Sequence, residues 1–332
     1  MVQWMRKPIR LYTARPGFAP GPTGTAGAGV RAGVYFPAGW APLIALWLAC
    51  LLMVSAGCQA GQTSAEATTG GARSLVIQDK GSDTLVNLAL AWAEEYMRAH
   101  PEVSISVTGG GTGTGIAAML NGTADIANAS RSMKPEELDS AAKIGMQPVE
   151  HTVALDAIAV VVNPANPVSA LTLQQISDIY TGKITNWKEV GGDDRPIVLL
   201  SRESNSGTYV YFLENVIRMG KKSELLFSPN TLLMPSSQGI SSEVRHNPNV
   251  IGYDGLGYVT PDQKVVAVAR DKPGPFVLPS AATVNDGSYP ISRPLFMYTP
   301  HEPSGQVKAY IDWILTDGQV KVSELGFVPL SR

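Results

Sequence analysis

Residues 201–208 read SRESNSGT, a short polar stretch with one arginine, Arg202, and one glycine, Gly207. The apolar run PIVLL at 196–200 precedes it with the pattern of a strand, and YVYFLENVI at 209–217 follows with the pattern of a helix. A strand, a short turn and a helix in this order form the repeating unit of α/β folds. The stretch therefore predicts an α/β protein with a polar turn at the start of a helix.

The chemistry of this turn suits an anion. The first backbone N–H groups of a helix have no partner within the helix, and the helix dipole places positive charge at that end. Glycine lets a ligand approach the backbone closely, and serine and threonine add hydroxyl donors. An arginine such as Arg202 adds a planar charged group that matches the edge of an oxyanion.

Three further turns have the same composition. They follow predicted strands and read GSDT at 81–84, GGGTGTG at 109–115 and ASRS at 129–132. For any single turn, ordinary helix capping by serine or threonine is the simpler explanation. Four such turns in one chain, two of them with an arginine, favour a shared oxyanion site where several helix ends point to one place.

Other segments support the same fold class. The run ALDAIAVVVN at 154–163 is almost continuously apolar, which is typical of a strand buried on both faces of a sheet. Residues 85–100 carry large apolar side chains at helical spacing. These are Leu85, Leu88, Trp92 and Tyr96. We expect an α/β fold with a mainly parallel sheet.

The overall composition is that of a globular protein. The chain has 332 residues, of which 44% are apolar and 16% are charged, enough for one large domain or two medium ones. A net charge of −2 gives no electrostatic argument for nucleic acid as a partner. An aromatic content of 7% argues against a surface on which bases stack.

The sequence contains no recognisable catalytic or metal-binding motif. The four histidines lie far apart, and none has the spacing of metal ligands. There is no G-x-S-x-G motif, and Ser206 has no evident base to activate it. We therefore expect no catalytic residue, no metal and no cofactor.

The first 65 residues differ from the rest of the chain because they contain no acidic residue. Scattered basic residues precede an uncharged apolar run from Ala41 to Gly57, and Cys58 follows it. This order predicts an export signal at 1–57. The run is short for a membrane span, which needs about 20 residues. A signal peptide without lipidation and a membrane anchor remain alternatives.

Cys58 is the expected lipidation site. The two small residues before it resemble the bacterial lipobox, whose cysteine carries fatty acyl groups such as palmitate and begins the mature chain. The usual leucine three places earlier is replaced here by Ser55. The other cysteine, Cys50, lies within the signal, so the exported domain would have no disulfide. Residues 58–74 are small and polar and predict a flexible tether.

From about Leu75 to Leu330, the chain resembles the phosphate-binding lipoproteins of bacterial phosphate ABC transporters. The most distinctive matching segments are YTGKITNW at 180–187 and SRESNSGT at 201–208. Other matching segments follow in the family's order: GSDTL, GGGTGTGI, GTADIANASR, IGYDGLGYV, YPISRPLFMY and GFVPL. The resemblance thus covers the whole chain after the predicted tether.

The resemblance implies a two-lobed periplasmic-binding-protein fold of type II, with the ligand in the cleft between the lobes. The chain would cross between the lobes near Ala157 and near Leu256. The first lobe would then comprise residues 75–156 and 257–332, and the second residues 157–256.

The resemblance also implies a site for inorganic phosphate at the four turns. The implied ligand residues are Thr84, the backbone N–H of Leu85, Thr112, Ser130, Arg131, Arg202, Ser206, Gly207 and Thr208. The last four belong to SRESNSGT, which would close on the phosphate from the second lobe.

One position departs from part of the family. Some members have an aspartate where this chain has Arg131, and that aspartate accepts the phosphate proton and so rejects sulfate. Other members carry arginine there. The candidate acceptors near the predicted site are Asp83, Asp125 and Glu203, although a helix cap, a turn bond or a salt bridge is the simpler explanation for each.

We expect an exported, lipid-anchored, monomeric protein that captures phosphate and delivers it to the permease of an ABC transporter. It would act by hinge closure and without catalysis. The alternatives are a general oxyanion receptor, a sensory or adhesive relative that no longer takes part in transport, and a phosphate-ester hydrolase. A hydrolase would need a metal pair or an activated nucleophile, and the sequence offers neither.

Overall fold

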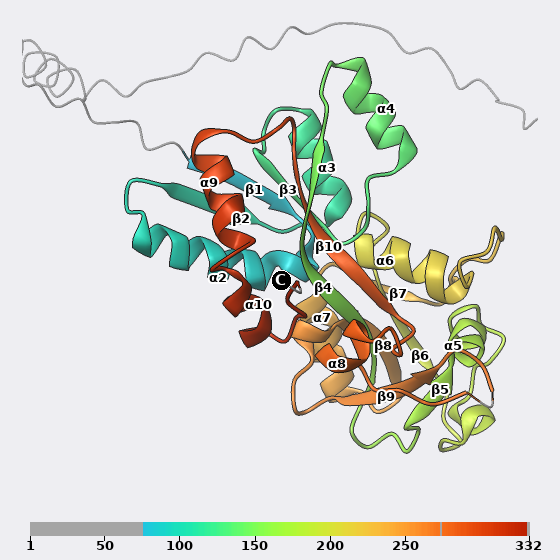
Figure 1. The fold of residues 1–332 in the computed structure, drawn as a ribbon. Helices are drawn as coiled ribbons and strands as arrows, with labels where there is room; N and C mark the ends of the chain where they lie inside the picture. Colours follow the sequence, from blue (N-terminus) through green and yellow to red (C-terminus); the bar gives the residue numbers. More distant parts are fainter. Residues whose placement is uncertain (1–75, 273, 331–332) are drawn as a thin grey trace, which may run out of the picture. The chain divides into compact units, whose positions relative to one another are not determined.

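The computed structural model describes residues 76–272 and 274–330. In chain order, the strands are β1 (Val76–Gly81), β2 (Ser104–Thr108), β3 (Ile126–Ala129), β4 (Val149–Val162), β5 (Ala170–Thr172), β6 (Val198–Arg202), β7 (Leu232–Met234), β8 (Val250–Gly255), β9 (Lys264–Ala269) and β10 (Ser292–Thr299). The main helices are α2 (Asp83–Ala99), α3 (Thr112–Leu120), α4 (Pro135–Lys143), α5 (Leu173–Tyr180), α6 (Gly207–Phe212), α7 (Ser237–His246), α8 (Ala281–Asn285), α9 (Gly305–Ile314) and α10 (Gln319–Glu324). Strands and helices alternate, so the predicted α/β class is confirmed (Figure 1).

The strands form a mixed sheet in the order β2-β1-β3-β10-β4-β8-β6-β7, with β9 on β4 and β5 on β9. Strands β1, β2 and β3 pair in parallel, as do β6, β7 and β8. Strand β10 is antiparallel to both β3 and β4, and β4 is antiparallel to β8 and β9. The prediction of a mainly parallel sheet was therefore wrong for its centre, because β10 returns from late in the chain and inserts beside β4.

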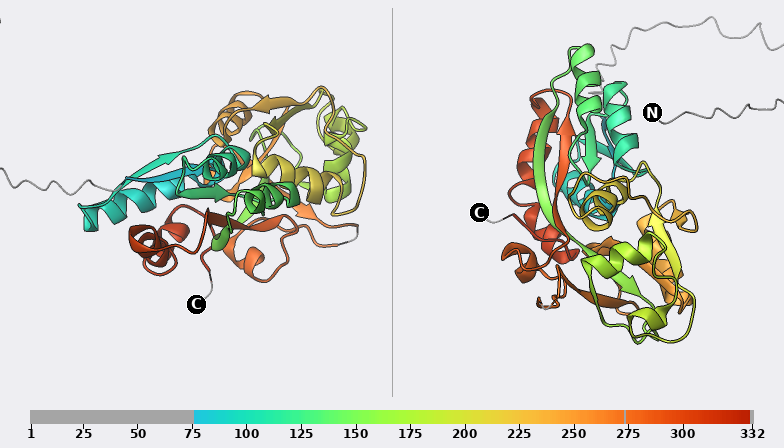
Figure 2. Two further views of the ribbon diagram at one scale, coloured as in Figure 1. Left: turned by 90° about the horizontal axis from the view of Figure 1, so that it is seen from above. Right: turned by 90° about the vertical axis from the view of Figure 1, so that its right-hand side faces the viewer.

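Strand β4 is the longest described strand and joins two parts of the sheet. Its first part, Val149–Ala157, pairs with β10, and its last part, Ile158–Val162, pairs with β8. Figure 2 shows β4 and β10 running side by side. The predicted strand at 154–163 is confirmed, and its apolar residues from Ala157 to Val162 are fully buried.

Two large hydrophobic clusters lie along this sheet. In the first, the predicted inward face of α2 packs with residues of α9, including Ile311 and Ile314. All four side chains predicted for that face are buried there: Leu85, Leu88, Trp92 and Tyr96. The helical spacing read from the sequence thus identified one face of the core correctly.

The second cluster contains the late part of β4 and the residues around β5, α5 and β8. It also contains Val266 and Val268 of β9, and Tyr289 and Ile291 from the segment before β10. Figure 1 shows β9 and α8 beside β5 and β8. Residues 264–291 therefore pack with the segment 157–256, to which the sequence analysis did not assign them.

The predicted signal at 1–57, the predicted tether at 58–74 and Cys58 lie outside the described residues. Within residues 76–272 and 274–330, no helix has the length and apolar character that a membrane span requires.

Candidate functional site

Four hydroxyl side chains, one from each of the four predicted turns, meet at one place. The Oγ1 atoms of Thr84 and Thr208 are 2.8 Å apart, and Thr112 Oγ1 lies 3.3 Å from Ser130 Oγ. The backbone N–H of Ser130 also donates to Thr112 Oγ1 at 3.0 Å. All four residues are buried. We call Thr84, Thr112, Ser130 and Thr208 the hydroxyl cluster.

The sheet explains why these turns converge. Strands β1, β2 and β3 are parallel neighbours, so their carboxyl ends lie at the same edge, where α2 and α3 begin and where Ser130 follows β3. Thr208 arrives from the other end of the sheet, at the start of α6 after β6. The site therefore combines residues that are 124 positions apart in the chain.

Gly207 lets this fourth turn approach the other three. A Cβ atom at this position would lie 2.5 Å from both Ser130 Oγ and Thr112 Oγ1, well inside van der Waals contact. No other residue could occupy the position without displacing the hydroxyl groups. The glycine of SRESNSGT is thus required by close packing at the site.

Two other residues of the stretch SRESNSGT, Asn205 and Ser206, stabilise the turn through hydrogen bonds. Ser206 is the N-cap of α6, and its Oγ accepts a hydrogen bond from the N–H of Thr208 at 3.2 Å. The backbone oxygen of Asn205 accepts from the N–H of Gly113 at 2.9 Å, and its side-chain amide donates to the oxygen of Gly110 at 2.8 Å. Ser206 thus caps its helix, and Asn205 joins the α6 turn to the glycine-rich turn before α3.

Arg202 is buried next to the hydroxyl cluster but bonds to other groups. Its guanidinium forms an ion pair with Asp83, donates to Ser237 Oγ at 2.9 Å, and donates to the backbone oxygens of Pro235 and Met234. Asp83 also accepts from the N–H of Gly110. The predicted ligand Arg202 therefore lies in a network that includes the start of α7.

Arg131 and Leu85 are also engaged with other partners. The guanidinium of Arg131 forms a two-point ion pair with Glu137, at 2.8 and 2.7 Å, and donates to the oxygen of Ser132. Burial raises the pKa of Glu137, but the hydrogen bonds and charge of Arg131 outweigh it and hold that pKa below its usual value. The N–H of Leu85 donates to the oxygen of Ser82 at 3.0 Å.

The structure adds a charged pair that the sequence analysis did not identify. Arg293, on β10, forms an ion pair with Asp156, on β4, at 3.1 Å, and the two side chains are 1% and 0% exposed. Arg293 also donates to Thr208 Oγ1 at 2.9 Å, to Thr84 Oγ1 at 3.4 Å and to the oxygen of Ser130 at 2.8 Å. It therefore contacts three of the four residues of the hydroxyl cluster.

A signal for this pair was present in the sequence. Asp156 is the single charged residue in the apolar run 154–163, and Arg293 lies in the matching segment YPISRPLFMY. A lone charge in a buried run that is otherwise almost wholly apolar requires a partner of opposite charge. The sequence could indicate that a partner exists, but not which residue it is.

Two buried acids lie close to the site. Burial raises the pKa of Asp156, and the charge and hydrogen bonds of Arg293 oppose this only in part. Burial raises the pKa of Asp254 to about 7, although Ser237 and the charge of Arg202 lower it in part. Asp254 is the last residue but one of β8, next to Gly255, where an added Cβ would lie 3.1 Å from both carboxylate oxygens of Asp156.

The three predicted proton acceptors have different positions. Asp83 is paired with Arg202 beside the cluster. Asp125 accepts a hydrogen bond from the N–H of Gln78 on β1 at 2.8 Å, which is a long-range bond and not the turn bond of the simpler explanation, and Glu203 is exposed. Among these three, Asp83 is thus the one placed next to both Thr84 and Arg202.

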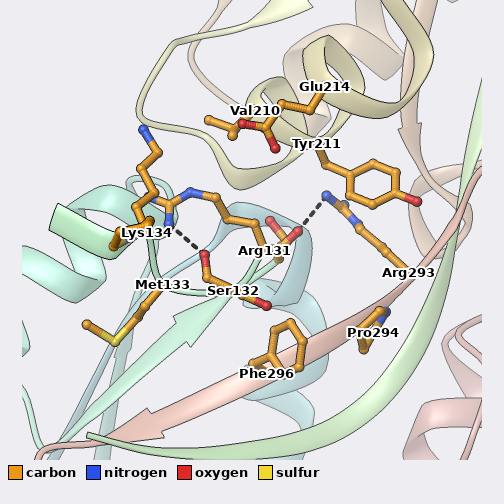
Figure 3. Close-up of a pocket in the computed structure, with 12 residues that line it drawn as sticks. Arg131, Ser132, Met133, Lys134, Val210, Tyr211, Glu214, Arg293, Pro294 and Phe296 are labelled. Atoms are coloured by element: carbon orange, nitrogen blue, oxygen red, sulfur yellow. Dashed lines mark hydrogen bonds between the residues drawn. The ribbon is translucent and has the colours of Figure 1, made fainter. Parts of the chain in front are cut away.

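A pocket of about 320 Å³ opens beside the hydroxyl cluster. Figure 3 shows Arg293 and Tyr211 together at one side of it, and Arg131 and Lys134 at the other. The guanidinium of Arg293 lies 5.5 Å from the centre of the Tyr211 ring. The pocket gives an approach to Ser130 and Arg293 from solvent.

Comparisons with known sequences give the family. Residues 61–318 match the model of the PBP superfamily domain. The phosphate-binding protein PstS of Pseudomonas aeruginosa is 36% identical over 268 residues, which cover 75% of this chain and 81% of the relative. The phosphate-binding protein PstS of Bacillus subtilis is 31% identical over 298 residues, which cover 87% of this chain and 94% of the relative.

Solved structures agree with the sequences. A Clostridium perfringens protein crystallised with bound phosphate superposes with a TM-score of 0.69 at 36% identity, covering 77% of this chain and all of that one. An ABC-type phosphate transport receptor from Vibrio cholerae superposes with a TM-score of 0.60 at 30% identity, covering 76% of this chain and all of that one. The fold is therefore that of the periplasmic binding proteins. The chain belongs to the PBP superfamily and, within it, to the family of the phosphate-binding proteins PstS.

Proposed function

We propose that this protein is an extracytoplasmic receptor that captures inorganic phosphate and delivers it to the permease subunits of an ABC transporter. The observation that carries the proposal is the hydroxyl cluster, in which four turns from separate parts of the sheet bring their donors together. The names of the relatives and the phosphate bound to the Clostridium perfringens protein support the choice of anion. The function requires binding and release, and no catalysis.

The cluster has the chemistry that a tetrahedral anion needs. Hydroxyl groups can turn their hydrogens toward an oxyanion, and buried hydrogen bonds to a charged acceptor are about twice as strong as neutral ones. Each arginine near the cluster is paired with an acid: Arg131 with Glu137, Arg202 with Asp83 and Arg293 with Asp156. The site is therefore rich in donors while its own charges are balanced.

The proposed ligand set follows the geometry. Thr84, Thr112, Ser130 and Thr208 supply hydroxyl groups, and Ser206 and Gly207 supply the turn that holds Thr208. Arg202 would join them by exchanging a present contact for the anion. Arg131 would likewise have to exchange a present contact for the anion, and its two hydrogen bonds to Glu137 make this exchange harder than for Arg202. The N–H of Leu85 would have to release the oxygen of Ser82.

The proposed mechanism is closure of two lobes on the anion. The two hydrophobic clusters support a first lobe of residues 76–156 and 292–330 and a second lobe of residues 157–291. This division keeps the expected crossing near Ala157, but it places the other crossing at the start of β10 instead of near Leu256. Thr84 and Thr208 would then close from opposite lobes, which is how hinge proteins couple binding to a change of surface.

The proposed location follows from the family and from the first residues of the chain. Residues 1–57 would direct export, Cys58 would carry the lipid, and residues 58–74 would tether the domain to the membrane. The domain would act as a monomer on the outer side of the membrane. Mass spectrometry of the protein purified from membranes tests the lipid: a mature chain that begins at an acylated Cys58 is the expected product.

Calorimetric titration tests the binding function. The protein is stripped of bound anion and titrated with inorganic phosphate, with Thr208→Val as the site variant and Thr185→Val as the control, because Thr185 is exposed. We expect tight binding of phosphate, a loss of roughly 10- to 100-fold in Thr208→Val, which removes a hydroxyl that would bond to a charged ligand, and no change in the control. Absence of phosphate binding to the native protein would refute the proposal.

A second candidate function is that of a receptor for oxyanions in general. It is favoured by Arg131, which stands where some members carry an aspartate and which is bound to Glu137 instead of facing the cluster. Titration with sulfate separates the two functions. Phosphate binding without sulfate binding supports the specific receptor, and similar affinities for both anions support the general one.

A further inference from the structure

Among residues 76–272 and 274–330, Arg293 is a charged side chain that bonds directly to the hydroxyl cluster. Its Nη1 atom donates to the oxygen of Ser130 at 2.8 Å, and its Nη2 atom reaches Thr208 Oγ1 at 2.9 Å and Thr84 Oγ1 at 3.4 Å. Its side chain is 1% exposed. In the described part of the chain, neither of the other two arginines near the site bonds to any member of the cluster.

One nitrogen of Arg293 has more acceptors than it can serve at once. Nη2 carries two hydrogens, yet it lies within hydrogen-bond distance of Thr84, Thr208 and Asp156. The two threonine hydroxyl oxygens are also 2.8 Å apart, so they can keep a hydrogen bond to each other when the bond from Arg293 is lost. The bond from Arg293 to the cluster can therefore be transferred to an anion while the two threonine hydroxyls stay bonded to each other.

Asp156 holds the guanidinium in this direction. Its Oδ2 accepts from both Nε and Nη2 of Arg293, at 3.3 and 3.1 Å, and its Oδ1 accepts from the N–H of Leu256 at 3.2 Å. A buried guanidinium needs a partner of opposite charge whether or not an anion is present. Asp156 provides that partner and leaves the edge that faces Thr84 and Thr208 available.

The pocket gives this arginine a route to solvent. Arg293 lines it together with Ser130, Arg131 and Lys134, and the ring of Tyr211 lies against the guanidinium. Ser130 is the member of the hydroxyl cluster that lines the pocket, so an anion in the pocket would lie beside Ser130 and Arg293. The arginine is thus buried against its acid partner but remains within reach of the pocket.

We infer that Arg293 is a phosphate-binding residue of this site, that its guanidinium bonds directly to the anion beside Thr84 and Thr208, and that Asp156 is the positioning residue that orients it. This inference rests on the proposed function and adds to it a source of positive charge from strand β10, outside the four turns. Arg202 then contributes from the far turn, while Arg293 is fixed to the strand pair β4 and β10.

The test is a set of variants titrated with inorganic phosphate. Arg293→Gln alone leaves Asp156 buried without its partner, and a misfolded protein would explain a loss of binding equally well. The double variant Arg293→Gln with Asp156→Asn removes both charges together and lets the two amides bond to each other. Arg195→Gln is the matched control, because it removes one positive charge from an exposed side chain.

The expected result is a folded double variant, with a melting temperature near that of the native protein and an affinity for phosphate at least about 100-fold lower. That factor corresponds to the loss of one or two hydrogen bonds from a charged donor. The control should bind within about twofold of the native protein. A double variant that melts normally and binds phosphate within about threefold of the native protein would show that Arg293 only neutralises Asp156, and the inference would be overturned.

Two further measurements keep the inference open to refutation if the double variant does not fold. Arg293→Lys keeps the charge but loses the planar fork, so we expect roughly tenfold weaker binding with little change in stability, and unchanged affinity would contradict the inference. A crystal structure of the phosphate complex should place Nη1 or Nη2 of Arg293 within about 3.2 Å of a phosphate oxygen, and a longer separation would overturn it. If the native protein does not bind phosphate, the proposed function fails first and the inference fails with it.

Discussion

Two buried aspartates of the same sheet differ in whether their carboxylate has a partner of opposite charge. Asp156, on β4, receives three hydrogen bonds, two from Arg293 and one from the N–H of Leu256. Asp79, on β1, is equally buried, but within the described residues no hydrogen bond of normal geometry reaches either of its carboxylate oxygens. Burial raises the pKa of Asp79 to about 7, and the nearby side chain of Asn128 lowers it only in part.

The difference separates two uses of a buried acid. Asp156 forms an ion pair with Arg293, which also contacts the site. Replacing Asp156 alone would leave Arg293 buried without an opposite charge, which destabilises the folded protein. With a pKa of about 7, Asp79 is about half protonated at pH 7 and carries a proton over much of the lower range in which an ordinary aspartate is charged. A third acid, Glu137, lies nearer the surface in its pair with Arg131 and has a lowered pKa.

The largest effect is expected for Asp156→Leu. The variant leaves Arg293 buried with no opposite charge, and breaking a buried pair in this way costs about 3–5 kcal/mol. Urea unfolding at pH 7 measures the loss. The matched change Asp79→Leu removes no paired charge and should be neutral or stabilising, so equal losses in the two variants would mean that the pairing of Asp156 has no energetic importance.

The next effect is a pH dependence that Asp79→Asn removes. An acid with a raised pKa binds its proton more tightly in the folded protein, so it stabilises the fold progressively less as pH rises from about 4 toward the folded pKa near 7. The expected slope is about −1.4 kcal/mol per pH unit from this group. Urea unfolding from pH 4 to pH 8 measures it in the native protein and in the variant. The other acids titrate in both proteins, so the difference between the two curves isolates Asp79, and parallel curves would contradict the assignment.

The smallest effect is expected for Glu137→Gln, with the opposite sign of pH dependence. Glu137 has a lowered pKa, so its contribution is present above the unfolded pKa and is lost as pH falls through the lower, folded pKa. Hydrogen bonds to a charged group are worth about 1.5–3 kcal/mol, and the partial exposure of this pair places the expected loss at the lower end. Thermal unfolding at pH 7 and pH 3 measures it: the variant should be less stable than the native protein at pH 7, and the difference should be smaller at pH 3.

The turns of the site could be predicted because their pattern is local. Thr84, Thr112, Ser130 and Thr208 each follow a strand and lie at or just before the start of a helix, so a few residues on either side identify them. Parallel strands then bring such turns to one edge without further information. The helical face of α2 was equally visible, since Leu88 and Trp92 follow the helical period.

The charge pair and the centre of the sheet could not be predicted in the same way. Asp156 and Arg293 are 137 residues apart, and each lies within a strand that carries no turn signal. The antiparallel position of β10 between β3 and β4 depends on pairing across the whole chain, which no local pattern encodes. The ion pair of Arg131 with Glu137 was easier to predict, because the two residues are only six positions apart and Glu137 also caps α4 by accepting from the N–H of Lys134.

The two buried tryptophans give the molecule an optical probe in each hydrophobic cluster. Trp92 belongs to the cluster around α2 and α9 and donates its indole N–H to the oxygen of Gly318, and Trp187 belongs to the cluster around β5 and β8 and donates to the oxygen of Asn249. A buried indole emits at shorter wavelength than one in water, so the red shift of each emission reports the opening of its own cluster. Proteins that retain only Trp92 or only Trp187 among the six tryptophans of the chain would show whether the two halves of the fold melt together or in sequence.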